Sequence, residues 1–495
     1  MKTRRLFCTL LLALTVLTVG AQQRIPCLRD IPAGGAKTRG LLGYPYQNWD
    51  PQRIYRQLVV LISFSDCDFS MDDPQSYYHR LLNEPGYNEG YGVGSVADYF
   101  RDQSGGLLNL QFDVYGPVRV SQKAKSTNKI NYGTSSMDDA MESLMAAVDI
   151  DYSLYDWDGD GSPNQVIFIA AGFCGNQVSG YIWPNTGFFG AIGNVDFDMA
   201  SISCELWGDS SSCGIGTICH EFSHCLGLPD IYPTSGSNFS AVDEWDLMDG
   251  GNYTNKGWCP PNFSTMEKML MGWSNPIELT DATTITGMKP VSEGGETYII
   301  RNSDNEDEYY ILENRRQSHW DYAIPGQGLA IFHVDYDREI WSNNGVNSFS
   351  GHYRYDLFHA DGKDYRTWDP ANNGLDMTKY TMDHWSRNRY LSTSVYPFAD
   401  GNTVNEVLTD DSDPKAVVYT ANAEGVMLMS KPITNIRMAD DGTISFDFMG
   451  GATAIRGVKS VAPKDQWFDL QGRRLPGRPV CKGLYIHNGK KESIR

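Results

Sequence analysis

Residues 218–230 read ICHEFSHCLGLPD and place two histidines four positions apart. On an α-helix, positions four apart project from the same face, one turn above the other. The imidazole nitrogens of His220 and His224 can therefore reach one tetrahedral Zn²⁺ at about 2 Å. Glu221 stands next to His220, where its carboxylate can reach a water on the metal without binding the ion. The spacing predicts two zinc ligands and one general base.

The residues after the histidines predict how the helix ends and where a third ligand comes from. Gly227 suits the left-handed position that caps a helix, and Pro229 prevents the helix from continuing. Because this turn swings Asp230 back toward the ion, we expect its carboxylate to be the third ligand. Three other carboxylates compete for that place: Glu205, Asp243 and Glu244.

The same letters could also describe a polar helix with solvated histidines. The flanking segments, GIGTI and CLGL, are small or apolar, which predicts that the helix is buried. Buried imidazoles need a polar partner, because burying an unpaired polar group is costly. The sequence therefore favours a metal site.

A second acidic motif, DWDGDGSPN at 156–164, has the spacing of a calcium loop. Asp156, Asp158 and Asp160 take alternate positions. A glycine fills the sixth place and Asn164 the ninth, and oxygen ligands at these intervals wrap a Ca²⁺ ion. The glutamate that usually completes such a loop is absent, so a solvated acidic turn is the alternative. We expect a structural Ca²⁺ that fixes the strand behind the active site.

Length and charge restrict the classes of function. The chain has 495 residues, which favours two or three domains, and a formal net charge of −20. An acidic protein of this size repels nucleic acid and anionic membranes, so we expect neither as a partner.

The first 21 residues predict export. Three basic residues precede an apolar run at 6–19, and small residues follow up to Ala21, as in a secretory signal peptide. The apolar run is too short to span a bilayer comfortably, and no later segment is long and apolar enough. We expect the export machinery to deliver a secreted or cell-surface protein.

The apolar pattern predicts an α+β half that carries the histidine helix. Continuous apolar runs at 56–66 and 164–172 indicate buried strands. Short helices are expected at 96–106, before two glycines, and at 136–150, where a serine cap precedes early acids.

Two further stretches alternate as strands do. Residues 107–120 read as a pair of strands around Gly116 and Pro117, and 194–205 as one strand before the histidine helix. From 277 to 450, short β-rich runs separated by turn residues predict an all-β, sandwich-like domain.

The histidine motif and several other stretches resemble the immune inhibitor A-like metallopeptidases, which are secreted zinc endopeptidases of bacteria. The similarity covers roughly residues 58–450 and includes VADYFRDQSGG, YDWDGDGSPNQVIFIAAG, WDLMDGG, EYYILENRR, GLAIFHVD and HADG. The resemblance implies a zincin-type catalytic domain, a twisted mixed sheet with an active-site helix and a backing helix. It further implies that His220 and His224 bind zinc, that Glu221 is the base, and that Met248 forms an apolar floor beneath the ion.

Peptide hydrolysis also needs a hydrogen-bond donor for the oxyanion. Tyr232 follows the helix exit and Tyr253 follows the methionine, so both are candidates, although packing is the simpler role for each. We expect a polypeptide substrate to add as a strand along 194–204, at the rim of the cleft.

The end of the chain has a different character. Residues 453–495 hold ten Lys or Arg against three Asp or Glu, which marks a separate module. The stretch WFDLQGRRLPGRPVCKGLYIHNGKK resembles the carboxyl-terminal ends of exported proteins in Bacteroidetes-type bacteria, including their sorting domains.

The expected organisation has five segments. These are a signal peptide at 1–21, a pro-segment at 22–56, a zincin domain at 57–276, a β-rich domain at 277–450 and a basic tail at 451–495. We expect a secreted zinc-dependent endopeptidase acting on proteins or peptides. The alternative is a catalytically degenerate zincin that serves as a secreted or surface binding protein.

Overall fold

A computed structural model describes residues 28–29, 49–126, 129–235, 240–349, 351–363, 391–401 and 403–452, and parts of the chain between 467 and 494. The predicted leader at 1–21 and most of the predicted pro-segment lie outside these residues. Among the described residues, no helix combines the length and apolar character needed to cross a membrane.

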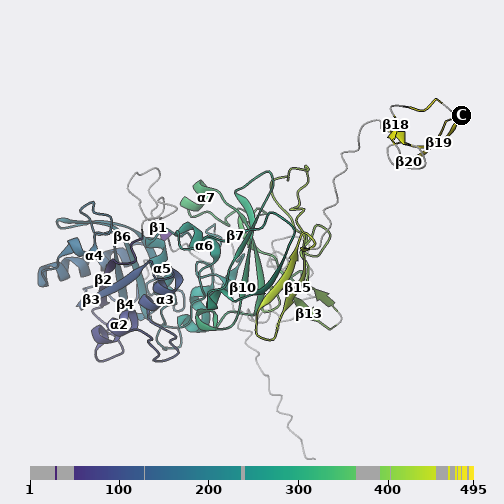
Figure 1. Cartoon of the computed structure of the whole chain (residues 1–495). Coiled ribbons are helices and arrows are strands. Elements are labelled where there is room, and N and C mark those ends of the chain that lie inside the picture. The colour runs from purple at the N-terminus through teal and green to yellow at the C-terminus, as the bar shows by residue number, and fades with distance from the viewer. Residues whose placement is uncertain are drawn as a thin grey trace, which may run out of the picture.

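The first half of the chain is built on one six-stranded sheet in the order β1-β5-β6-β4-β2-β3 (Figure 1). β2, β3, β4 and β6 run parallel, and β5 is antiparallel to β6. The strands are β1 Leu28–Arg29, β2 Ile54–Ser63, β3 Asn109–Arg119, β4 Gln165–Phe173, β5 Asn185–Ile192 and β6 Val195–Leu206. β2 and β4 are buried nearly throughout, which is why both appear in the sequence as continuous apolar runs.

Helices lie between the strands along the chain. They are α2 Pro74–Asn83, α3 Val96–Gln103, α4 Lys129–Ala147, α5 Gly216–Cys225, α6 Thr265–Leu270 and the short α7 Arg338–Ser342. Short 3₁₀ helices lie at η1 Tyr152–Tyr155, η2 Asp243–Trp245, η3 Gly251–Gly257, η4 Val291–Glu293 and η5 His319–Asp321. The predicted helix at 96–106 is confirmed as α3, which a Ser95 capping box begins.

Three sequence expectations need correction. The stretch at 107–120 is one strand, β3, because Gly116 takes φ +96 within the strand and does not reverse the chain. α4 begins at Lys129, so Ser136 is a buried helical residue and does not cap the helix. The strand at 194–205 is not at a rim, because β6 pairs with β4 on one edge and β5 on the other.

The chain after residue 277 forms further sheets. One of them has five strands in the order β12-β11-β10-β9-β7. Its strands are β7 Ile277–Glu278, β9 Tyr298–Arg301, β10 Glu308–Arg315, β11 Gly328–Asp335 and β12 Tyr355–Leu357. A three-stranded sheet joins β8 Thr283–Met288, β15 Ile433–Met438 and β16 Ile444–Phe448, and a small hairpin joins β13 Phe398–Asp400 and β14 Thr403–Asn405. The tail contains β17 Trp467–Phe468, β18 Arg474–Leu475, β19 Gly483–His487 and β20 Lys490–Ile494.

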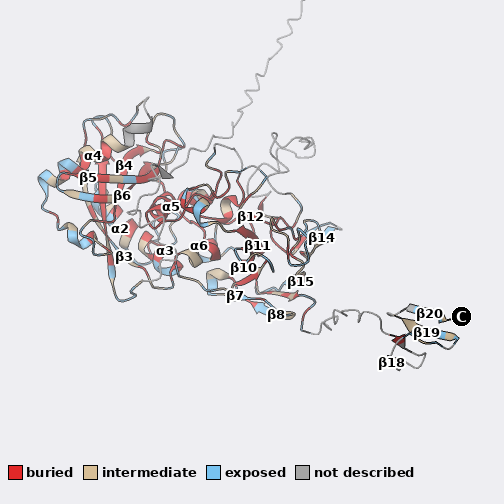
Figure 2. Ribbon diagram, turned by 90° about the horizontal axis from the view of Figure 1, so that it is seen from above, coloured by how far each residue is buried: buried red, intermediate tan, exposed pale blue. Residues whose placement is uncertain are grey.

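The two halves share one hydrophobic core. Ile311 of β10 packs into the core that contains the first sheet and α5, while its neighbours Tyr310 and Leu312 face a second core formed with β15 and β16. Buried residues therefore continue from the first sheet through α5 to β10 and β11 (Figure 2). The first core crosses the predicted domain boundary at residue 276.

A buried arginine ties the halves together. Arg315 of β10 is fully buried, and its guanidinium donates two hydrogen bonds of 2.8 Å to the carboxylate of Asp321. It also donates to the carbonyl oxygen of Trp245, which lies close before the methionine turn. The interaction therefore holds η2 against β10.

We predict that Arg315→Ala lowers the free energy of unfolding by about 3–5 kcal/mol, because the Asp321 carboxylate would stay buried without its cation. The neighbouring Arg316 is partly exposed and pairs with Glu293, so Arg316→Ala should cost less than about 1 kcal/mol. Denaturant unfolding followed by tryptophan fluorescence compares the two variants. Equal losses would contradict this view of the Arg315 cluster.

Candidate metal centre

Helix α5 is buried along its whole length. Gly216 lets its first turn approach η3 closely, because a Cβ there would lie 2.2 Å from the carbonyl oxygen of Asn252. His220 and His224 are 2% and 0% exposed, respectively. The helix is therefore not a solvated polar helix.

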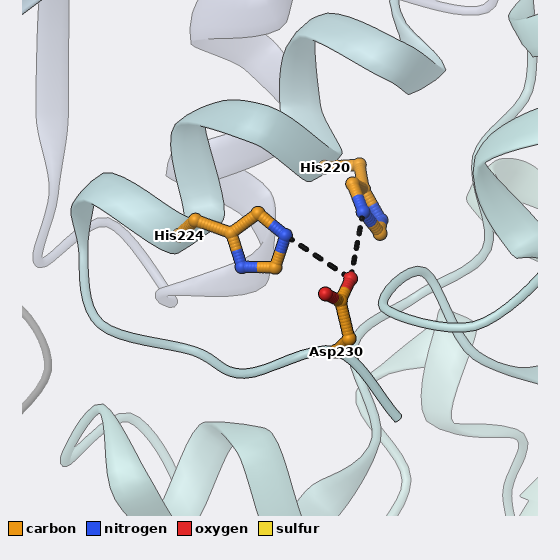
Figure 3. Close-up of side chains that lie close together, drawn as sticks. All are labelled: His220, His224 and Asp230. Atoms are coloured by element: carbon orange, nitrogen blue, oxygen red, sulfur yellow. Dashed lines mark ion pairs between the residues drawn. The ribbon is translucent and has the colours of Figure 1, made fainter. Parts of the chain in front are cut away.

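A backbone carbonyl orients each imidazole. Nδ1 of His220 lies 2.8 Å from the carbonyl oxygen of Leu247, and Nδ1 of His224 lies 2.6 Å from that of Leu228. Because a carbonyl oxygen only accepts hydrogen bonds, Nδ1 carries the proton in both rings. Nε2 of each ring therefore faces the carboxylate of Asp230, as Figure 3 shows. Metal-binding histidines are oriented in this way.

The exit from α5 delivers this carboxylate. Gly227 takes φ +104, and its N–H donates to the carbonyl oxygen of His224. The N–H of Leu228 donates to the carbonyl oxygen of Ser223, which completes a Schellman motif. The chain then turns beneath the helix, and Asp230 arrives fully buried.

An asparagine from the second half fixes Asp230. The side-chain amide of Asn344 donates to Oδ2 of Asp230 at 2.8 Å, and its Oδ1 accepts from the Asp230 N–H at 2.6 Å. Oδ1 of Asp230 is thereby turned toward the two imidazoles. Asn344 follows α7 and has φ +54, a left-handed conformation that asparagine adopts more readily than most residues.

The three donor atoms have the spacing of a zinc site. Oδ1 of Asp230 lies 3.4 Å from Nε2 of His220 and 3.2 Å from Nε2 of His224. Two ligands that bind one tetrahedral ion at about 2.1 Å lie about 3.4 Å apart. The side chains therefore fit zinc at three of its four corners.

Burial by itself would raise the pKa of the Asp230 carboxyl. The charge of the facing His224 and hydrogen bonds from both imidazoles outweigh burial and hold that pKa well below its ordinary value. Asp230 is therefore ionised at neutral pH, which a hard oxygen ligand requires.

Glu221 lies on the same helix and is 2% exposed. The hydroxyl of Thr186, on β5, lies 2.8 Å from its Oε2 and 2.8 Å from its backbone carbonyl oxygen. The carboxylate is thus held between α5 and the sheet. Neither this hydroxyl nor Asn344 was identified from the sequence, because nothing in either local stretch points to a distant partner.

Among the competing carboxylates, the structure groups Asp230 with the histidines. Glu205 is used elsewhere: Oε1 accepts from the N–H of Ser70 and Oε2 from that of Gly172. Asp243 and Glu244 lie on η2, which is a different segment from the exit of α5. Within η2, Asp243 takes φ +46.

The other predicted site residues are the methionine expected beneath the ion and the two tyrosines expected near the oxyanion. Met248 is fully buried, and its carbonyl oxygen accepts from the N–H of Ile231, next to Asp230. The ring of Tyr232 stacks on that of His220, with centroids 6.5 Å apart. The hydroxyl of Tyr253 accepts a hydrogen bond of 2.9 Å from the side-chain amide of Asn176.

The acidic loop brings Asp156, Asp158 and Asp160 together, with one oxygen of each within 4.8 Å of the others. Asn164 is turned differently. Its Oδ1 accepts from the N–H of Trp157, and its amide nitrogen donates to Asp158. The loop therefore gathers three carboxylates, with Asn164 as a hydrogen-bond donor to one of them.

Comparison with protein families shows that residues 195–273 match the immune inhibitor A peptidase M6, catalytic domain. This segment runs from β6 through α5 and Asp230 to beyond the methionine turn. Among curated proteins, the chain is 25% identical over 285 residues to immune inhibitor A of Bacillus thuringiensis subsp. alesti, covering 45% of this chain and 41% of that protein. It is 23% identical over 270 residues to pre-pro-metalloprotease PrtV of Vibrio cholerae serotype O1 (strain M66-2), covering 47% and 29%, respectively.

The chain thus spans less than half the length of either relative. The matched family segment nevertheless contains both histidines and Asp230, which the structure brings to one buried point, and it also contains Glu221. Residues 195–273 are thus similar in sequence to the catalytic domain of the immune inhibitor A peptidase M6 family.

Proposed function

We propose that this protein is a zinc-dependent endopeptidase that hydrolyses peptide bonds in proteins. One observation carries the proposal: two imidazole nitrogens and one ionised carboxylate oxygen converge with the spacing of zinc ligands. Glu221 follows His220 on the same helix, and its buried carboxylate is held by Thr186. The family and the metalloprotease relative support the same reaction.

In this proposal, His220, His224 and Asp230 hold the metal. When bound, Zn²⁺ supplies a Lewis acid that lowers the pKa of a water molecule and polarises the scissile carbonyl. Glu221 takes the proton of the attacking water and then gives it to the leaving nitrogen. Met248, which is fully buried, would form the apolar floor beneath the ion. Of the two proposed oxyanion donors, Tyr232 is favoured because its ring stacks on His220, whereas the hydroxyl of Tyr253 is bonded to Asn176.

The substrate strand is reassigned to β5. β5 is antiparallel to β6, and Thr186 on β5 contacts Glu221. Its outer edge accepts another strand, because Leu28 and Arg29 pair with Thr186 and Gly187. An extended peptide that took the place of residues 28–29 on this edge would pass the base. The strand was missed in the sequence because Gly187 and Gly190 interrupt its apolar pattern.

The binding-protein alternative is less well supported. A degenerate zincin has no need of a positioned base, yet Glu221 is present, buried and hydrogen-bonded. Export through the signal peptide at 1–21, a pro-segment at 22–56 and a surface role for the basic tail remain proposals that rest on the sequence.

We predict that Glu221→Gln abolishes cleavage of casein, with kcat reduced by at least about 100-fold, because the base is lost while the ligands stay. Zinc content, measured by atomic absorption, should remain near one ion per chain. Glu293→Gln, which changes a partly exposed carboxylate paired with Arg316, should retain wild-type activity. Zinc-dependent cleavage by Glu221→Gln would refute the assigned base.

We predict that Asn344→Ala weakens zinc binding by about 10- to 100-fold, because Asp230 loses the amide that orients it. Competition with a chromophoric chelator gives the affinity. Asn343→Ala is a matched control, since the adjacent Asn343 is exposed. Unchanged affinity in Asn344→Ala would show that Asp230 does not depend on this support.

We also propose that the acidic loop binds a structural Ca²⁺ through Asp156, Asp158 and Asp160. The three carboxylates are drawn together, and a divalent cation would offset their mutual repulsion.

We predict that protein treated with EGTA and then reloaded with zinc melts at a lower temperature than protein also given Ca²⁺, because the loop would keep uncompensated charge. Differential scanning calorimetry measures the shift. Asp158→Asn should reduce the response to Ca²⁺, and an unshifted melting temperature in the wild type would eliminate the calcium proposal.

A further inference from the structure

Thr186 occupies a junction between the base and the edge of the sheet. Its side chain is fully buried on β5, and its hydroxyl lies 2.8 Å from both Oε2 and the backbone carbonyl oxygen of Glu221. Its main chain lies opposite Ser201 of β6 on one side and Leu28 of β1 on the other. The residue therefore contacts the base through its side chain and an added strand through its main chain.

We propose that Thr186 is a positioning residue that holds the Glu221 carboxylate in line for proton transfer. This inference rests on the proposed peptidase function. The three zinc ligands alone assign no role to position 186, and the inference depends on the two contacts between the Thr186 hydroxyl and Glu221.

The hydroxyl can serve the base in both of its protonation states. A threonine hydroxyl has one hydrogen to donate and two lone pairs that accept. While Glu221 is ionised, the hydroxyl donates to Oε2. After Glu221 has taken the proton of the attacking water, its own O–H can donate to Oγ1, and the threonine hydrogen turns to the Glu221 carbonyl oxygen. Both acceptors lie at 2.8 Å, so this exchange needs only rotation of the hydroxyl.

The position on β5 gives the contact its rigidity. β5 is hydrogen-bonded to β6 over most of its length, so the hydroxyl is carried by a fixed strand. A peptide that replaced β1 on the outer edge of β5 would pair beside Thr186, where Leu28 lies in this structure. Thr186 would then fix the position of the substrate strand relative to the Glu221 carboxylate. Proton transfer depends on that relative position.

A purely structural role predicts a different result. If the hydroxyl only ties α5 to the sheet through the Glu221 carbonyl, its loss lowers stability without changing the chemical step. If it positions the carboxylate, its loss lowers kcat while KM and zinc content hold. The two roles therefore separate in one set of measurements.

The test compares Thr186→Val, which keeps the shape and removes the hydroxyl, with Thr186→Ser, which keeps the hydroxyl. Wild type and Glu221→Gln are assayed in parallel on a quenched-fluorescent decapeptide. We expect Thr186→Val to retain its zinc and its KM within about twofold and to lose about 10- to 100-fold in kcat. Thr186→Ser should stay within about threefold of wild type. Thr254→Val, which removes another buried hydroxyl bonded to the carbonyls of Gly251 and Cys259, should keep its kcat.

A second readout does not depend on turnover. A peptide hydroxamate presents an acidic group where the attacking water would lie, so its affinity reports the placement of the base. We expect its inhibition constant to rise in Thr186→Val and to be restored in Thr186→Ser. Wild-type kcat and inhibition constant in Thr186→Val, or failure of serine to restore them, would overturn the role of Thr186 alone. Absence of zinc-dependent cleavage by the wild type would overturn the proposed function itself.

Discussion

A buried carboxylate that must face positive charge organises the catalytic half. Asp230 is fully buried, and an ionised carboxylate in such a place is stable only when cations or strong donors surround it. Its Oδ2 takes a hydrogen bond from Asn344, and its Oδ1 is directed at two imidazoles whose Nδ1 atoms are held by backbone carbonyls. Each element around the site contributes to this arrangement: α5 sets the histidine spacing, the Schellman turn returns the chain, and the methionine segment supplies the Leu247 carbonyl.

The part of the site that the sequence predicted is the part set by local geometry. The spacing of His220 and His224 follows from the helical repeat, and the conformation of Gly227 follows from the way a helix ends. Asp230 is only six residues beyond His224, so one turn is enough to return it. The buried strands β2 and β4 were readable for a similar reason, since strands covered on both faces are continuously apolar.

The parts that were missed depend on contacts between distant segments. Asn344 reaches Asp230 across 114 positions, and Thr186 reaches Glu221 across 35. An asparagine after a short helix and a threonine in a glycine-containing strand each have ordinary local explanations. Strand order also depends on contacts between distant segments. The alternation at 194–205 fits an edge strand and an inner strand equally, and pairing with β5 makes this strand an inner one.

Because the two halves share a core, truncating the chain between them would remove residues that support the metal site. The matched family segment ends at residue 273, before β10 supplies Arg315 and before α7 is followed by Asn344. A fragment truncated near the segment's end would keep every predicted ligand and still lack the amide that steers one of them. Under the proposed zinc role, such a fragment would hold the ion more weakly than the assembled pair of halves, and zinc affinity would report whether the two halves have docked.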